Sequence, residues 1–147
     1  MWDNSKVACP NHLRILLDMV LMNGSNSFQI EKGQAIFRLV GRMSLEESAA
    51  ACVDAIRLAA KQGITELLVN LTRATDLGPI STLDRFWLAK QFASAAIPGF
   101  KLAVVANRDM IDQQHFGVMV ARNRGLQANV FTTEQEAQVW LRSYQPI

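Results

Sequence analysis

Two short apolar runs constrain the fold of this 147-residue chain more than any other feature. Glu66–Leu71 reads ELLVNL and Lys101–Ala106 reads KLAVVA, and neither run alternates apolar with polar side chains. Such runs are typical of strands that are buried on both faces, as in a parallel sheet covered by helices. Helical patterns separate the runs, so the sequence predicts an α/β protein.

Capping signals predict where four helices begin. Ser44, Ser81 and Thr133 are each followed, three residues later, by a carboxylate residue, which is the pattern of a capping box. Asp109 is expected to cap the remaining helix, the third in chain order, and Gly125 to close it. The sequence therefore predicts four capped helices between and after the strands.

The helix that starts at Ser81 contains several large apolar residues. Leu83, Phe86 and Trp87 recur at helical spacing, and Phe92 continues the pattern. We expect them to form the face that packs on the core. The alternative interpretation is that Phe86, Trp87 and Phe92 line an apolar cavity.

Two further strands precede the first helix. Phe28–Ile30 and Ala35–Val40 flank a short turn with Gly33, which indicates a hairpin. With a last strand at Ala128–Phe131, the predicted order is ββαβαβαβα, a five-stranded mixed β-sheet with an N-terminal hairpin. We assign residues 28–147 to this domain and residues 1–27 to an N-terminal extension.

The extension contains the apolar segment Ile15–Met22. It is shorter than the ~20 residues that a membrane-spanning helix needs, so we predict no membrane span. Three interpretations stay open: an extra helix on the domain, a partner-binding helix, or sequence upstream of a true start at Met22.

Composition excludes several classes of protein. Half of the residues are hydrophobic and 19% are charged, which argues against disorder. The net charge of +2 gives no reason to expect a nucleic-acid partner. Cys9 and Cys52 share no metal or redox spacing with each other or with the two histidines, so we predict no metal, no cofactor and a reduced, cytoplasmic setting.

Three stretches carry a resemblance to a known family: Phe37–Glu47, Leu67–Thr72 and Arg124–Leu141. Their order and spacing resemble the SpoIIAA-like (STAS/SEC14 domain) family over most of the chain. The resemblance implies a small non-enzymatic regulatory module of the bacterial anti-sigma factor antagonist type, which acts by protein–protein contact and is switched by serine phosphorylation. It also implies an alternative, a module that binds a lipid or another small apolar ligand. A homodimer stays open.

The switch serine of the family lies in an Asp-Ser-x-Gly motif at the start of the second helix. In this chain the corresponding position is Pro79, so the motif is not intact. Ser81 and Thr82 follow closely and are the candidate phosphosites, because phosphate is stabilised at a helix N-terminus. The alternative for Ser81 is a plain N-cap.

Three arginines follow predicted strands. Arg42, Arg73 and Arg108 each come just past the C-terminal end of a strand, the edge at which ligands bind in open α/β sheets. They are candidate contacts for an anion or an acidic partner. His115 has no neighbouring nucleophile in the sequence, so we predict no catalytic residues and no enzyme activity.

Overall fold

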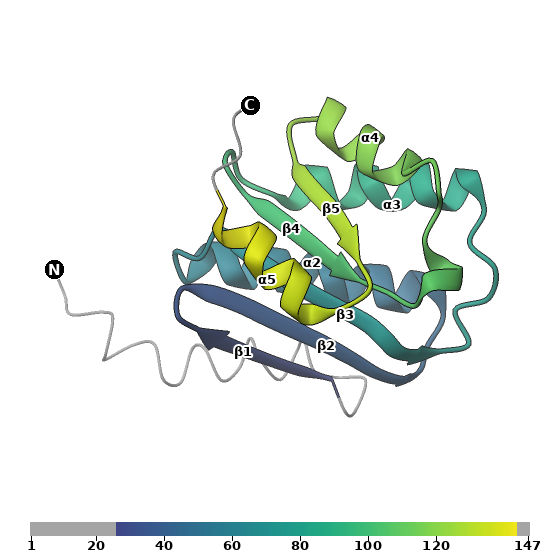
Figure 1. The fold of residues 1–147 in the computed structure, drawn as a ribbon, viewed down its shortest axis with the longest axis horizontal. Helices are drawn as coiled ribbons and strands as arrows, with labels where there is room; N and C mark the ends of the chain where they lie inside the picture. The colour runs from purple at the N-terminus through teal and green to yellow at the C-terminus, as the bar shows by residue number, and fades with distance from the viewer. Residues whose placement is uncertain (1–25, 144–147) are drawn as a thin grey trace, which may run out of the picture.

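The computed structural model describes residues 26–143, and the expected alternation of strands and helices is confirmed there (Figure 1). Within these residues a five-stranded mixed sheet is covered by four α-helices, as the sequence predicts. In chain order the elements are β1 (Ser27–Glu31), β2 (Gln34–Arg42), α2 (Leu45–Lys61), β3 (Glu66–Thr75), α3 (Thr82–Ala95), β4 (Lys101–Val105), the short 3-10 helix η1 (Arg108–Met110), α4 (Phe116–Asn123), β5 (Gln127–Phe131) and α5 (Glu134–Arg142).

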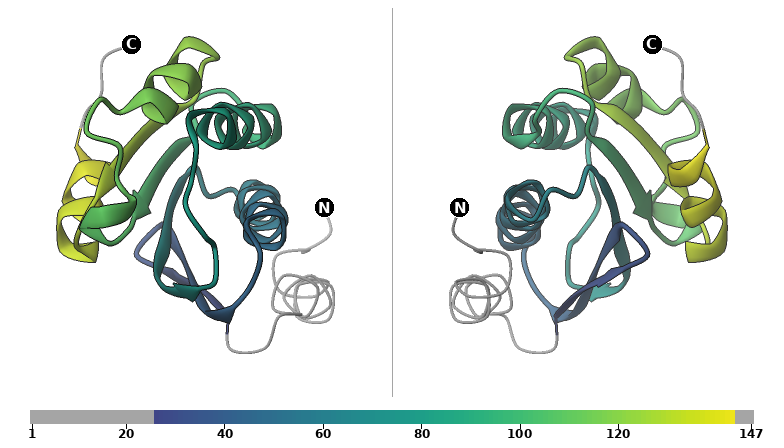
Figure 2. Two further views of the ribbon diagram at one scale, coloured as in Figure 1. Left: turned by 90° about the vertical axis from the view of Figure 1, so that its right-hand side faces the viewer. Right: turned by 90° about the vertical axis from the view of Figure 1, so that its left-hand side faces the viewer.

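The strands lie in the sheet in the same order as in the chain. β1 pairs antiparallel with β2, and β2 to β5 are parallel. Right-handed crossovers that advance in the same direction across a sheet place their helices on the same face, and here all three advance from β2 toward β5. The three crossover helices α2, α3 and α4 therefore share one face, and α5, which follows the last strand, covers the other (Figures 1 and 2).

The hairpin turn is set by two residues with positive φ. Lys32 and Gly33 have φ angles of 51° and 82°. Two consecutive residues of this kind match the turn whose twist suits a two-residue hairpin. The turn fixes the register of β1 on β2, in which Phe28 lies opposite Phe37.

Two apolar cores form on the two faces of the sheet. On the α5 face, Ile36, Leu68 and Val105 pack against Ala137 and Leu141 of α5, and all five are essentially inaccessible. The other core is larger and lies between the sheet and α2, α3 and α4. Its largest side chains are Phe37, Leu39, Ile56, Leu67, Phe100 and Leu102.

β3 is longer than the apolar run predicts. The apolar run ends at Leu71, but the strand continues to Thr75. The longer β2 supplies the pairing partner, with Val40 opposite Arg73. A bulge shifts the register just before this pair and places one extra residue in β3.

The predicted starting point of the third crossover helix, α4, was wrong. Asp109 lies in η1 and does not cap an α-helix; α4 begins only at Phe116, after His115 with φ 55°. The carboxylate of Asp112 accepts hydrogen bonds from the backbone N–H groups of Phe116 (2.8 Å) and Gln114 (3.4 Å). Asp112, and not Asp109, therefore accepts a hydrogen bond from the first backbone N–H group of α4.

The other predicted helix starts are confirmed. Ser44 and Ser81 each form a complete capping box, and the Thr133 hydroxyl accepts a hydrogen bond from the N–H of Glu136. None of the helices within residues 26–143 is long and apolar enough to cross a membrane.

The segment Ile15–Met22 and the start at Met22 lie outside the described residues. Asn26 is the first residue described; it is buried, and its Oδ1 accepts a hydrogen bond from the N–H of Val40 at 2.9 Å. The contact ties the chain just before β1 to the C-terminal half of β2.

Candidate functional site

An apolar cavity of about 150 Å³ lies between the sheet and the crossover helices. Its floor is formed by β3, β4 and β5, and its walls by α2, α3, α4 and the segments that follow β3 and β4. It therefore extends toward the carboxyl ends of the parallel strands, where open α/β sheets bind ligands. The apolar lining consists mainly of Leu45, Val69, Leu71, Leu77, Ile80, Leu88, Ala89, Phe92, Leu102, Val104, Met110, Ile111, Val118, Leu126 and Val130.

The inner face of α3 is not the one that the sequence predicts. Leu83 is 78% exposed, and Phe86 and Trp87 are 37% and 38% exposed, so these three do not form the core-facing side. Ala89 is the one fully buried residue of α3, and Phe92 packs on the core beside it. Of the three aromatic residues proposed as a cavity lining, only Phe92 lines the cavity.

Three polar side chains join the cavity lining near the α3–α4 contact. Arg85 donates from Nη1 to the carbonyl oxygen of Met110 at 3.2 Å, and Asp112 and His115 lie on the same wall. The hydrogen bond from the N–H of Phe116 holds the pKa of Asp112 below its ordinary value, and Arg85 and His115 add to this. The wall thus keeps an ionised carboxylate next to the cavity, with an arginine beside it.

Cys52 lines the cavity from α2. Burial raises the pKa of its thiol to about 12, so the side chain is a neutral thiol at physiological pH. A neutral, buried thiol is a poor nucleophile and behaves as a small apolar group. Across residues 26–143, no three histidine, cysteine or carboxylate side chains gather closely enough to hold a metal ion.

Ser81 and Thr82 lie where the sequence predicts, at the exposed start of α3. The Ser81 hydroxyl accepts a hydrogen bond from the N–H of Asp84, and the Asp84 carboxylate accepts one from the N–H of Ser81, both at 3.0 Å. Ser81 is therefore the N-cap of α3. Thr82, the first residue of the helix, is exposed and has no side-chain hydrogen bond within the described part of the chain.

The three candidate arginines do not share one geometry. Arg42 is the last residue of β2 and forms an ion pair with Asp76 at 2.8 Å, with both side chains mostly exposed. Arg73 lies within β3, not after it, because the strand continues to Thr75. Arg108 is in η1. Arg73 and Arg108 are exposed, and neither has an ion pair among residues 26–143.

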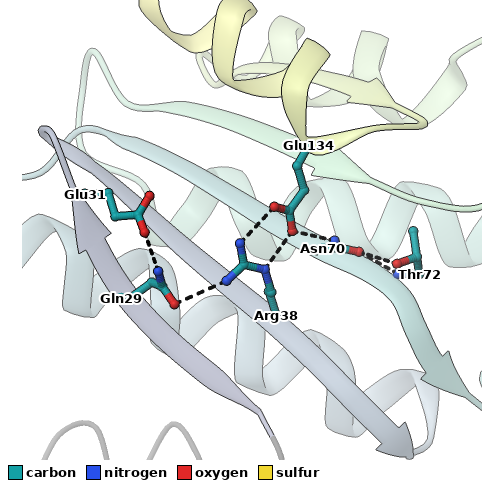
Figure 3. A network of polar contacts seen from close by, with 6 residues as sticks. All are labelled: Gln29, Glu31, Arg38, Asn70, Thr72 and Glu134. Atoms are coloured by element: carbon teal, nitrogen blue, oxygen red, sulfur yellow. Dashed lines mark hydrogen bonds and ion pairs between the residues drawn. The ribbon is translucent and has the colours of Figure 1, made fainter.

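A polar network on the other face of the sheet was not predicted from the sequence (Figure 3). Glu134, at the start of α5, accepts two hydrogen bonds of 2.8 Å from Arg38 of β2 and one of 2.6 Å from Asn70 of β3. The hydrogen bond from Arg38 lowers the pKa of Glu134. Gln29 extends the network from β1. Arg38 and Glu134, which bond directly, are 96 positions apart, so no local spacing could have revealed the network.

Comparison with known proteins identifies a structural neighbour. No protein-family model matches the chain, and no curated protein matches it. A solved structure from Shewanella loihica PV-4, described as an uncharacterized protein of the DUF3478 family with a SpoIIAA-like fold, shares 17% sequence identity. The match covers 80% of this chain and 92% of that one, with a TM-score of 0.44.

Proposed function

We propose that this protein is a non-enzymatic cytoplasmic module that binds a small apolar molecule, or the apolar end of a larger one, in the cavity beneath α3 and α4. The observation that carries the proposal is the cavity itself: about 150 Å³, lined almost wholly by apolar side chains. An apolar cavity of about this size in another protein stays dry and binds benzene or xenon. Of the two functions that the family resemblance implies, the geometry favours ligand binding.

The lining also limits the class of ligand. A cavity of about 150 Å³ accepts a group about as large as a benzene ring. Arg85, Asp112 and His115 supply polar contacts on one wall, so a ligand with one polar end can satisfy that end there. The Cys52 thiol is neutral and offers no covalent chemistry to the ligand.

Filling the cavity tests the proposal. Ala89 lies on the inner face of α3 and lines the cavity, so Ala89→Leu places three extra carbon atoms in it. We expect benzene to raise the Tm of the wild-type chain, because a ligand that binds only the folded state stabilises it. The Tm of Ala89→Leu should not respond to benzene.

A matched control is Ala50→Leu, which makes the same change at an exposed position of α2. This variant should respond to benzene as the wild type does. Native mass spectrometry of the full chain from cells should also show a bound apolar molecule. A wild-type Tm that is indifferent to benzene, together with no co-purified molecule, would contradict ligand binding.

The second candidate function is regulation by protein–protein contact at the start of α3. It is favoured by one observation: Ser81, Thr82 and Leu83 are exposed side by side at a helix N-terminus. A phosphate on Ser81 gains the unpaired N–H groups of the helix end but repels the carboxylate of Asp84, so it replaces the present cap. The exposed Arg73 and Arg108 offer contacts to an acidic partner.

Mass spectrometry of the protein isolated from its own cells tests this second candidate. Phosphate on Ser81 or Thr82, and a partner that is released or captured when it is present, would support regulation. A chain that carries no phosphate at either residue under all growth conditions would contradict it.

A further inference from the structure

The outer face of α3 carries an unusual combination of side chains. Leu83, Phe86 and Trp87 lie three and four residues apart, so they share one face of the helix, and all three are exposed. Single exposed apolar residues are common on protein surfaces. Three large ones within five residues of one helix form a patch that the fold itself does not use.

The patch is bordered by positive charge. The Lys90 ammonium nitrogen lies 5.4 Å from the centre of the Phe86 ring, and the Arg124 guanidinium carbon, at the end of α4, lies 5.8 Å from it. Neither cation has an ion pair among residues 26–143. The one carboxylate of α3, Asp84, is bonded to the N–H of Ser81 in the capping box. The exposed residues of α3 are Thr82, Leu83, Phe86, Trp87, Lys90, Gln91 and Ser94, and none is acidic.

We propose that this face, defined by Leu83, Phe86, Trp87, Lys90 and Arg124, docks on the surface of an anionic lipid layer. A tryptophan and a leucine on the outside of a helix insert shallowly at the boundary between headgroups and acyl chains. Lysine and arginine beside them meet the anionic headgroups. The charge complementarity selects an anionic surface over a neutral one.

The shape of the patch favours a lipid layer over a protein partner. The side chains stand on the outside of a helix, and the apolar cavity of this region lies on the opposite, inner side of α3. A stable protein–protein interface uses about 20–30 residues on each side, many more than this patch contains. A fluid lipid surface needs no matching shape.

The proposal stands apart from the ligand proposal, although the two share a helix. α3 contributes Leu88, Ala89 and Phe92 to the cavity and Leu83, Phe86 and Trp87 to the outer face. Docking therefore brings the cavity within one helix diameter, about 10 Å, of the lipid layer. Neither event requires the other.

Vesicle co-sedimentation of the full chain tests the proposal. We expect binding to phosphatidylcholine vesicles that contain about 30% phosphatidylserine, and much weaker binding to pure phosphatidylcholine. Raising the salt from about 0.1 M to about 0.5 M should weaken the binding, because it screens charges at an exposed surface. The Trp87 fluorescence should shift to shorter wavelength on binding, and Trp87→Phe should remove most of that shift.

Two double variants separate the apolar from the ionic contribution. Leu83→Ser with Trp87→Ser should lower the partition coefficient at least about tenfold. Lys90→Gln with Arg124→Gln should lower it about 25-fold on anionic vesicles, since each cation near the surface contributes about fivefold, and should change binding to neutral vesicles little. All four positions are exposed, so both proteins are expected to fold.

Matched controls come from α5 and from the turn between β1 and β2. Val139→Ser removes an apolar side chain that is 66% exposed on α5, and Lys32→Gln with Arg142→Gln removes two exposed cations. Both controls should bind vesicles as the wild type does.

Three results would overturn the proposal: no binding to anionic vesicles, equal binding to neutral ones, or controls that lose as much as the α3 variants. Concentration-dependent dimers that Leu83→Ser with Trp87→Ser abolishes, without vesicle binding, would assign the face to a second copy of the chain instead. The same α3 variants should keep the benzene response of the cavity. Failure of docking with that response intact would leave the ligand proposal standing.

Discussion

The two faces of the sheet are held in different ways. α5 packs on a fully buried core and is also bonded at both ends: Glu134 to Arg38 and Asn70, and the carbonyl oxygens of its last turn to the ammonium group of Lys101. α3, on the opposite face, has one buried residue and lies over a cavity. One face is fixed by polar contacts and close packing, whereas the other has room beneath its helix. Binding is therefore expected on the side with the fewest constraints.

The two faces of the sheet should differ most in the unfolding free energy that is lost when a leucine of their covering helix is changed to alanine. Leu141 of α5 is fully buried, so Leu141→Ala should lower the free energy of unfolding by about 3 kcal/mol. Leu88 of α3 is half-buried beside the existing cavity, and Leu88→Ala should cost less than half as much. Urea denaturation of both variants measures the two values. Equal losses would remove the distinction between the faces.

The next largest loss of stability is expected when Lys101, which holds the C-terminal end of α5, is changed. Nζ of Lys101 donates to the carbonyl oxygens of Leu141 and Ser143 at 2.6 and 2.7 Å. A lysine at this position satisfies carbonyl groups that the helix leaves unpaired. Lys101→Met keeps an unbranched side chain but removes the ammonium group, which also lies 5.2 Å from the centre of the Trp140 ring, and should cost about 1–2 kcal/mol. A change within error of zero would show that these hydrogen bonds do not hold α5.

The contacts of Glu134 at the N-terminus of α5 should make the free energy of unfolding depend on pH. The pKa of Glu134 is lower in the folded chain than its ordinary value of 4.5. The stability that it contributes is therefore present above that value and is lost as the pH falls through the lower, folded-state pKa. Glu134→Gln should cost about 1 kcal/mol at pH 7, since the carboxylate is partly exposed. The difference between variant and wild type should shrink as the pH is lowered from about 5 to 3. A difference that is independent of pH would contradict this role.

The smallest effect is expected at the second ion pair. Arg42 and Asp76 lie as close together as Arg38 and Glu134, at 2.8 Å, but the Arg42 side chain is 85% exposed. Exposed pairs contribute about 0–1 kcal/mol and are screened by salt. Arg42→Ala should change the unfolding free energy by less than about 0.5 kcal/mol, and less still in high salt. A loss as large as that of Glu134→Gln would mean that burial does not distinguish the two pairs.

Most of the fold could be predicted because its signals are local. The runs at Glu66–Leu71 and Lys101–Ala106, and the caps at Ser44 and Ser81, each lie within a few residues of sequence. They determine where elements begin and which strands are buried.

The candidate site was harder to predict, because it depends on which way a helix is turned. α3 has two apolar faces, one with Leu83, Phe86 and Trp87 and the other with Leu88, Ala89 and Phe92. Spacing cannot rank two such faces, and the larger side chains suggested the wrong one. The bulge in β3 has a similar effect at Arg73, because an extra residue changes which face of the sheet the following side chains lie on.

The strand order also has a consequence for the order of events during synthesis. Because β2 to β5 follow one another across the sheet, each crossover helix can dock as soon as its second strand is made. Within residues 26–143, α5 is the one helix that packs on its face of the sheet, so this face lacks that cover until Glu134–Arg142 has left the ribosome. Until then Ile36, Leu68 and Val105 stand open to solvent and to other chains. A nascent chain that stalls before α5 is thus the form of this protein most exposed to aggregation.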